Sequence, residues 1–298
     1  MVVLAFVTGA CTVTPPSRPG ELPVPYGILS ALPGTLDPGS PPPGANDFGC
    51  RSRAHPRPVV LVHGTFANQS NNWASLSPLL KNNGYCVFTF NYGAPALGGF
   101  AYGMGPIERS AAELAVFVDQ VMLRTGAEQV DLVGHSQGGM MPRYYLNFLG
   151  GGRRVHHLVA LAPSSHGTTF LGLVDLSRFF GISGLVDRLL AGFCVSCVQQ
   201  EAGSDFVKKM ASVPDTVPGV HYTVIASRYD EIVTPYESQF LSGPNVRNIT
   251  IQDVCALDND GHAGLAWDHI ALNEVLNALD PGRSVSVPCT FIPFDFGG

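Results

Sequence analysis

The sequence has few charged residues, and its basic residues form no cluster. Only 13% of the 298 residues are charged, and the 17 lysines and arginines are outnumbered by 23 acidic residues, so the net charge is −6. A protein that binds nucleic acid needs a basic patch or stripe to neutralise phosphates. The composition therefore argues against nucleic acid as a partner.

Long apolar runs are also scarce. Residues 1–11, MVVLAFVTGAC, form an apolar run that ends in small residues, as the end of a secretory signal does, and this predicts a secreted protein. The stretch Thr8-Gly9-Ala10-Cys11 also resembles a bacterial lipoprotein cleavage box, so a lipid anchor on Cys11 stays open. No other apolar stretch is long and uninterrupted enough to span a bilayer.

Patterns for binding metal are missing as well. Cys194-x-x-Cys197 has no second such pair and no neighbouring histidine, which favours a local disulfide over zinc. Four acidic residues near the carboxyl terminus do not follow the spacing of an EF-hand loop, and we expect a solvated acidic loop there: Asp253, Asp258, Asp260 and Asp268. We expect no metal and no other cofactor.

The cysteine count suits an oxidising compartment. The chain has seven cysteines, and removal of Cys11 with the leader would leave six. An even number of cysteines in a secreted chain predicts disulfides.

The chain does contain ample apolar material, arranged as alternating strands and helices. Hydrophobic residues make up 45% of the sequence. Apolar runs predict buried strands at 59–63, 85–92, 130–134, 155–162 and 221–227. Helical spacing of apolar residues follows in several intervals, including 107–122, 141–149 and 265–279. This alternation predicts an α/β fold with a mostly parallel central sheet and helices on both of its faces.

The composition also divides the chain. Residues 12–57 are rich in proline, glycine and serine, which predicts an extended segment over the domain surface. We expect residues 58–298 to form the catalytic domain. Within it, residues 164–213 contain an apolar stretch at 170–193. We interpret 164–213 as a small cap or lid beside the substrate, with a buried pair of core helices as the alternative.

A serine lies between two glycines where a predicted strand meets a predicted helix, in VDLVGHSQGGMMPRYYL (130–146). A Gly-x-Ser-x-Gly turn at this place is the nucleophile elbow of the α/β-hydrolase fold. The turn is tight, so its flanking residues must be small, and it presents the serine hydroxyl above the sheet. The pattern predicts Ser136 as a nucleophile.

A nucleophilic serine needs a base and a carboxylate that orients the base. In this fold the acid and then the histidine follow the serine along the chain. Asp230 lies just beyond the strand expected at 221–227, with Glu231 as the adjacent competitor. His262 lies in a loop position, whereas His269 falls within the helical pattern, which favours His262 as the base.

The transition state also needs donors for its oxyanion. One backbone N–H comes from the residue after the nucleophile, Gln137, and another from the loop after an early strand. That loop begins His63-Gly64-Thr65, and the N–H and hydroxyl of Thr65 are the candidates. An ordinary turn at His63-Gly64 is the alternative. We expect five residues near these elements to contact substrate: Phe66, His135, Ser164, Leu173 and Val233.

Several long motifs together resemble the secreted actinobacterial triacylglycerol lipases of lipase class 2. From about Val24 onward the chain carries VPYG, PPGANDFGC, RPVVLVHGTFAN, NNGYCVF, VDLVGHSQGGMMPRYYL, LAPSSHGTT, YDEIVTPY and GPNVRNITIQD. A weaker likeness to fungal lipase B type enzymes rests on the Gly-Thr turn, Ser-Gln-Gly-Gly, Asp-Glu-Ile-Val and His-Ala-Gly.

The resemblance implies an α/β-hydrolase fold and a role for each matching residue. Its catalytic positions fall on Ser136, Asp230 and His262, and its oxyanion donors fall on Thr65 and Gln137. It also implies disulfides between Cys50 and Cys86 and between Cys255 and Cys289, which leaves Cys194 to pair with Cys197.

The sequence thus predicts a secreted serine carboxylester hydrolase, a lipase or esterase that forms an acyl-enzyme. The substrate is a lipid or another ester, with transient contact at a lipid interface, and the protein is expected to be a monomer. A polyester or cutin-type hydrolase with the same machinery is the enzymatic alternative. A non-catalytic binding protein on the same fold is the other, since fold alone does not fix function.

Overall fold

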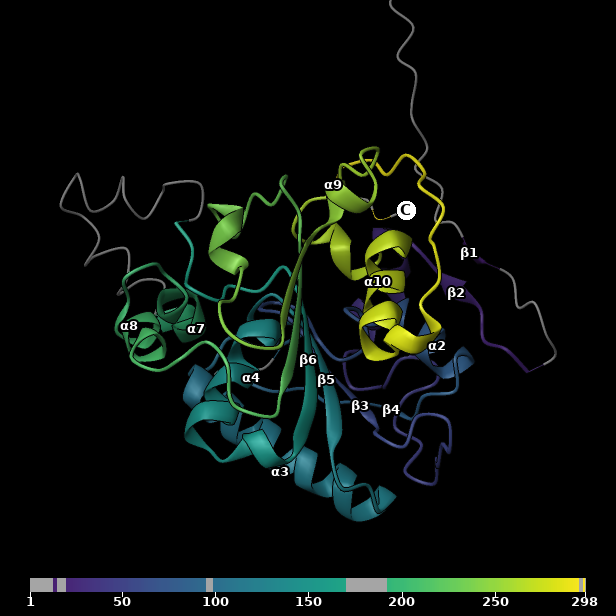
Figure 1. Cartoon of the computed structure of the whole chain (residues 1–298), viewed down its shortest axis with the longest axis horizontal. Coiled ribbons are helices and arrows are strands. Elements are labelled where there is room, and N and C mark those ends of the chain that lie inside the picture. Colours follow the sequence, from purple (N-terminus) through teal and green to yellow (C-terminus); the bar gives the residue numbers. More distant parts are fainter. Residues whose placement is uncertain (1–12, 15–19, 95–98, 170–191, 295–296, 298) are drawn as a thin grey trace, which may run out of the picture.

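A six-stranded sheet forms the centre of the computed structural model, which describes residues 13–14, 20–94, 99–169, 192–294 and 297 (Figure 1). All neighbouring strands run parallel. Their order across the sheet is β4 (Val87–Thr89), β3 (Val59–Val62), β5 (Val130–His135), β6 (Val155–Leu161), β7 (His221–Ala226) and β8 (Val246–Thr250). The parallel sheet expected from the sequence is confirmed.

Helices cover both faces of this sheet, so that the molecule has three layers (Figure 1). Val59 and Leu61 of β3 face a core that includes α2 (Leu76–Asn82) and α10 (His269–Leu279). The alternate residues of β3 face a second core that includes α3 (Ile107–Thr125) and α4 (Gln137–Phe148). Because successive side chains on a strand point to opposite faces, a sheet buried on both sides needs the continuous apolar runs seen in the sequence.

Some predicted boundaries differ from the structure. The strand expected over 85–92 has only three residues, Val87–Thr89. The helix expected from position 265 begins at His269, because the Asp268 carboxylate caps it by accepting hydrogen bonds from the N–H groups of Ile270 and Ala271, at 2.8 and 3.1 Å. Strand β8 was not predicted from its pattern, because this edge strand exposes its polar middle residues.

The segment 12–57 is more structured than the extended strip expected from its composition. Its described part contains β2 (Val24–Pro25), the 3-10 helix η1 (Ile28–Ala31) and the short helix α1 (Leu32–Leu36). Strand β2 pairs with β1 (Val13–Thr14) in a separate antiparallel sheet.

Short helices lie in the segments that connect these strands and helices, and one follows α10. The described part of the predicted cap, 164–213, contains α7 (Val195–Gln199) and α8 (Asp205–Ala211). The others are η2 (Gly151–Arg153), η3 (Tyr236–Gln239), α9 (Ile251–Val254), η4 (Gly264–Ala266) and η5 (Pro281–Arg283). Two earlier expectations, a leader over 1–11 ending at Cys11 and a substrate contact at Leu173, lie outside the described residues.

Three pairs of cysteines lie at disulfide distance. Cα–Cα separations are 5.7 Å for Cys50 and Cys86, 5.4 Å for Cys194 and Cys197, and 5.2 Å for Cys255 and Cys289. These are the pairs that the resemblance implied. Within the described ranges, no helix combines the length and the apolar character needed to cross a membrane.

Candidate active site

Ser136 occupies a strained turn between β5 and α4. Its backbone φ of 56° lies in the left-handed region, which few residues other than glycine adopt. A hydrogen bond of 2.8 Å from its N–H to the Leu161 carbonyl holds it there. A side chain on Gly134 would overlap the Gly138 carbonyl, and one on Gly138 would overlap the Val62 carbonyl. The two glycines of the motif are therefore required by the close packing of the turn.

The structure brings Ser136, His262 and Asp230 into one chain of hydrogen bonds. The His262 Nε2 lies 2.9 Å from the Ser136 Oγ, and its Nδ1 lies 2.8 Å from the Asp230 Oδ2. Asp230 follows β7, and His262 follows β8 and α9, so both come from loops beyond the carboxyl ends of the strands. Ligands of open parallel sheets bind at that end.

The acid is fixed by four groups. Its Oδ1 accepts hydrogen bonds from the N–H groups of Ile232 and Val233, at 2.9 and 2.7 Å. Its Oδ2 accepts one from the Gln239 Nε2 at 2.9 Å, besides the contact with His262. The carboxylate therefore has a single well-defined orientation toward the imidazole.

The two competing candidates lie elsewhere. The Glu231 Oε2 accepts a hydrogen bond of 3.1 Å from the backbone N–H of His262, so this carboxylate contacts the main chain of the base loop and not its imidazole. His269 is the first residue of α10, and its Nε2 lies 3.2 Å from the Thr290 Oγ1.

The turn in which the sequence predicts oxyanion donors, called here the oxyanion turn, follows β3 and lies beside Ser136. The backbone at Gly64 approaches so closely that a Cβ there would be 3.2 Å from the Ser136 Cβ. The Thr65 hydroxyl donates to the Gln137 Oε1 at 3.3 Å. Gln137 is the first residue of α4, where backbone N–H groups have no acceptor within the helix and point along the positive end of its dipole.

Gln200 is a part of this turn that the sequence did not reveal. Its Nε2 donates to the Thr65 Oγ1 at 3.0 Å, and its Oε1 accepts from the Ser164 Oγ at 2.8 Å. Gln200 follows α7, 135 positions after Thr65. No motif or spacing marks it, so sequence reasoning offered no signal for it.

Two further histidines, His63 and His135, lie near the site with neutral imidazole rings. Burial lowers the pKa of His63 to about 4 and that of His135 to about 3. The His63 ring stacks on Tyr92 with 4.3 Å between centroids. The His135 Nε2 lies 3.0 Å from the His262 carbonyl oxygen, which links the elbow to the base loop.

Buried carboxyls flank the base loop, which corrects the expectation of a solvated acidic loop. Asp258, Asp260 and Asp268 are fully buried, and Asp253 alone of the four is exposed. Asp258 and Asp268 share a side-chain hydrogen bond, and burial raises the pKa of both, that of Asp268 well above its usual range. The raised pKa values favour a proton between the two carboxyls, and the His269 Nδ1 lies 3.9 Å from the Asp268 Oδ1.

A cavity of about 340 Å³ opens over Ser136. Beyond Ser136, His135 and His262, its lining comes from the oxyanion loop, the base loop and the amino-terminal segment: Thr65, Phe66, Ala67, Asn71, Asn72, Ala263, Trp267, Ile28, Ala31, Leu32 and Thr35. Of the expected substrate contacts, Phe66 and His135 line it. Ser164 and Val233 do not: they are buried and support Gln200 and Asp230.

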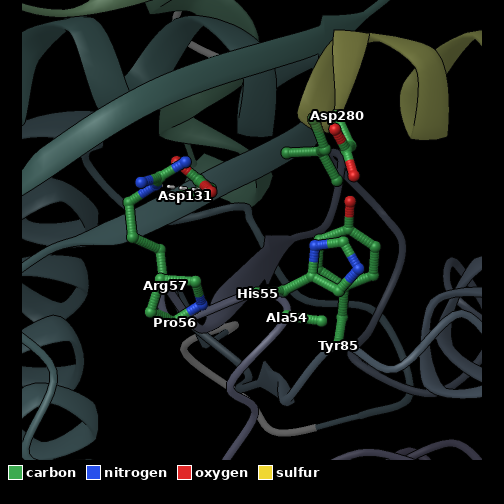
Figure 2. A pocket seen from close by; sticks show the side chains of 8 residues that line it. Ala54, His55, Pro56, Arg57, Tyr85, Asp131 and Asp280 are labelled. Carbon is green, nitrogen blue, oxygen red and sulfur yellow. Dashed lines mark hydrogen bonds and ion pairs between the residues drawn. The ribbon is translucent and has the colours of Figure 1, made fainter. Parts of the chain in front are cut away.

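A smaller cavity of about 100 Å³ lies at the opposite, amino end of the strands (Figure 2). His55 stacks on Tyr85 with 3.7 Å between ring centroids, and the Arg57 Nε lies 3.2 Å from the Asp131 Oδ2. Within the described part of the chain, its lining has no serine, threonine or cysteine beside a histidine, unlike the cavity over Ser136.

The cluster at Ser136 contains the groups that acyl transfer requires: a hydroxyl, an imidazole within hydrogen-bond reach of it, a carboxylate bonded to that imidazole, and the first N–H groups of a helix beside the hydroxyl. In the part of the chain that the structure describes, no group of three or more histidine, cysteine or acidic residues is placed to hold a metal ion.

Comparisons with known proteins show the family to which the chain belongs. The model of a family described as Lipase (class 2) matches residues 56–269. Over 92 residues, 29% of this chain, the sequence is 40% identical to a triacylglycerol lipase of Pseudarthrobacter phenanthrenivorans and to one of Burkholderia plantarii. These matches span only 27% and 24% of the two relatives' own lengths.

Solved structures share the fold. Lipase B of Aspergillus fumigatus superposes with a TM-score of 0.63 at 19% identity, over 94% of this chain and 63% of that one. The mature lipase BlEst2 of Bacillus licheniformis gives 0.53 at 18% identity, over 83% of this chain and 95% of that one. At these identities the likeness shows the α/β-hydrolase architecture alone.

Proposed function

Since the chain belongs to the class 2 lipase family, we propose that it is a serine carboxylester hydrolase, a lipase or esterase that works through an acyl-enzyme. In this proposal Ser136 is the nucleophile, His262 the general base and then the general acid, and Asp230 the residue that orients the imidazole. Thr65 and Gln137 supply the oxyanion donors. No cofactor takes part.

The reaction follows from the contacts in the site. The Ser136 Oγ attacks the ester carbonyl while His262 Nε2, 2.9 Å away, takes the hydroxyl proton. The carbonyl oxygen becomes an oxyanion beside the N–H groups of Thr65 and Gln137. His262 then gives its proton to the leaving alkoxide, which leaves an acyl group on Ser136. A water molecule, activated by the same imidazole, releases the acid.

Asp230 keeps the base in the useful tautomer. With the Nδ1 proton directed at the Asp230 Oδ2, 2.8 Å away, the lone pair of Nε2 faces the serine. The imidazolium that forms after proton transfer lies against a carboxylate, which stabilises its charge. The four groups that surround this carboxylate keep it in place through both half-reactions.

The observation that carries the proposal is the unbroken hydrogen-bond chain from Ser136 through His262 to Asp230, formed by residues 126 and 32 positions apart. A binding protein on this fold would have no need to keep such a chain intact. Secretion belongs to the proposal too, and the three cysteine pairs support it, since disulfides persist in oxidising compartments.

Hydrolysis of a soluble chromogenic ester tests the proposal. The wild type should turn the ester over, and Ser136→Ala should lower kcat by about 10⁴-fold or more, because triad members act as a unit. His269→Ala is the matched control and should stay near the wild type. Turnover retained in Ser136→Ala, with unchanged thermal unfolding, would remove the serine from the mechanism.

A further inference from the structure

We propose that the segment Gly27–Leu36, called here the amino-terminal wall, is a fixed side of the ester pocket and selects substrates that carry an uncharged hydrocarbon arm. The inference rests on the proposed function and adds to it a selectivity determinant outside the elbow, the acid and base loops and the predicted cap. It starts from the cavity over Ser136, to which the wall contributes Ile28, Ala31, Leu32 and Thr35.

The chemistry of the cavity defines the arm that it accepts. Among the described residues that line it there is no lysine, arginine, aspartate or glutamate, and burial keeps His135 neutral. On the wall, Leu32 is 57% exposed and Ile28 is 36% exposed, while Ala31 packs against Trp267. Phe66 adds a half-exposed ring from the oxyanion loop. An apolar lining of this kind favours a hydrocarbon chain and disfavours a charged one, which would lose its hydration without gaining a partner.

Hydrogen bonds from side-chain amides anchor the wall to the loop after the oxyanion turn. The Asn68 Nδ2 donates to the Gly34 carbonyl at 3.1 Å, and the Asn71 Nδ2 donates to the Thr35 Oγ1 at 3.3 Å. Just beyond the wall, the Gln69 Nε2 donates to the Gly39 carbonyl at 2.7 Å. Asn68 and Gln69 are buried, so their two bonds are shielded from competing water, whereas the bond from Asn71 is exposed.

The contact between wall and loop leaves no room for a side chain. A Cβ on Gly34 would lie 2.5 Å from the Asn71 backbone nitrogen and 2.6 Å from the Ser70 Oγ. Glycine at this position therefore lets the two backbones meet. The wall is held by direct packing as well as by hydrogen bonds.

The other end of the wall is tied to the base loop. The Gly27 N–H donates to the Trp267 carbonyl at 3.2 Å, and the Trp267 indole Nε1 donates to the Asn71 carbonyl at 2.9 Å. Trp267 lies five positions after His262 on the same loop. The wall thus bridges the loop of the oxyanion donors and the loop of the base, which gives the pocket a set width between them.

Leu32 offers the sharpest test, because its side chain lines the cavity and is exposed enough to be replaced without disturbing the core. Leu36 of the same helix is 81% exposed and does not line the cavity, which makes it the matched control. The substrates are two series of esters at monomeric concentrations. One lengthens the acyl chain from acetate to laurate with a fixed alcohol, and the other lengthens the alcohol with a fixed acyl group.

Leu32→Ala should lower kcat/KM for long-armed esters by about tenfold relative to the wild type, at the low end of what apolar pockets discriminate because the side chain is half exposed. The shortest esters should be unaffected, since their arms do not reach the wall. Leu32→Phe, which keeps an apolar contact, should retain the preference for long arms, and Leu36→Ala should match the wild type. A change confined to one series identifies the acyl or the alcohol arm as the one bound.

Two failures can be told apart. If the wild type hydrolyses no ester in either series, the proposed function fails. If it hydrolyses them, but Leu32→Ala keeps the wild-type length profile in both series or Leu36→Ala changes it equally, the wall is not a selectivity determinant and the proposed function stands.

Discussion

Replacing Thr65 with valine would remove one hydroxyl from the oxyanion turn and keep both the backbone N–H and the branched shape of the side chain. In the structure the Thr65 Oγ1 accepts from the Gln200 Nε2 at 3.0 Å and donates to the Gln137 Oε1 at 3.3 Å. Gln200 fixes the oxygen, so the single hydroxyl proton can turn from the Gln137 side chain to an oxyanion that forms beside it.

The size of the effect follows from that exchange. A hydrogen bond between neutral groups contributes about 1 kcal/mol net, and one to a charged group contributes about 1.5–3 kcal/mol. Turning the hydroxyl toward the oxyanion therefore gains about 0.5–2 kcal/mol in the transition state, which corresponds to roughly a 2–30-fold decrease in kcat for Thr65→Val. The loss stays below the roughly 10²–10³-fold expected for an essential donor, because the backbone donors remain.

Steady-state kinetics on a soluble ester would measure the change. We expect kcat to fall and KM to stay level, since the hydroxyl meets a charge only in the transition state. Thr65→Ser restores the hydroxyl and should recover most of the rate. An unchanged kcat in the valine variant, or an increase in KM alone, would show that the hydroxyl does not serve the oxyanion.

Three other predictions concern the support of the site. Asp230→Asn should lower kcat by about 10⁴-fold with little change in folding, because an amide no longer holds the base in the right tautomer; kcat near the wild-type value would contradict the assigned acid. Burial raises the pKa of Asp258 and Asp268, so their contribution to stability is complete below the usual value of 3.8 and is lost as the pH rises through the raised values. Asp258→Asn, which holds an N–H where the shared proton lies, should give a Tm that declines less with pH than the wild type; parallel Tm–pH curves would refute the shared proton. Serine at both Cys255 and Cys289 opens a loop of 34 positions and should lower the free energy of unfolding by about 3–4 kcal/mol, as measured by urea denaturation; an unchanged midpoint would exclude the bond.

Local signals predicted the centre of the site. The elbow is a contiguous pattern, and the packing around Gly134 and Gly138 shows why that pattern is needed. Asp230 and His262 were predicted from chain order and from their place in loops, and the structure brings both together with Ser136 because the carboxyl ends of parallel strands converge. Glu231 shows the limit of this reasoning: only coordinates reveal that this neighbour of Asp230 contacts the main chain of the base loop.

Residues that act through distant contacts gave no such signal. Gln200 contacts Thr65 across 135 positions and belongs to no motif. Ser164 and Val233 were expected in the pocket because their segments end near it, but their side chains turn into the protein. Asp258 and Asp268 were expected in a solvated loop, since the sequence does not show that the two side chains meet in the core.

The proline-rich composition of residues 12–57 likewise did not show that part of this segment lines the cavity over Ser136. Composition reports the stiffness of a segment and not the surface on which it lies. The side-chain amides of Asn68 and Gln69 each donate a hydrogen bond to a single backbone carbonyl of this segment. Such hydrogen bonds depend on the folded positions of both segments, so the sequence does not predict them.

The anchoring of the amino-terminal wall has a consequence for recombination between relatives. The wall and the loop around Asn68 and Asn71 are complementary surfaces. At Gly34 they pack so closely that any side chain there would overlap the loop. A chimera that imports a foreign Gly27–Leu36 without the matching loop would break those amide contacts beside Thr65. We therefore expect a chimera to acquire the substrate preference of the donor protein only when the wall and the matching loop are exchanged together.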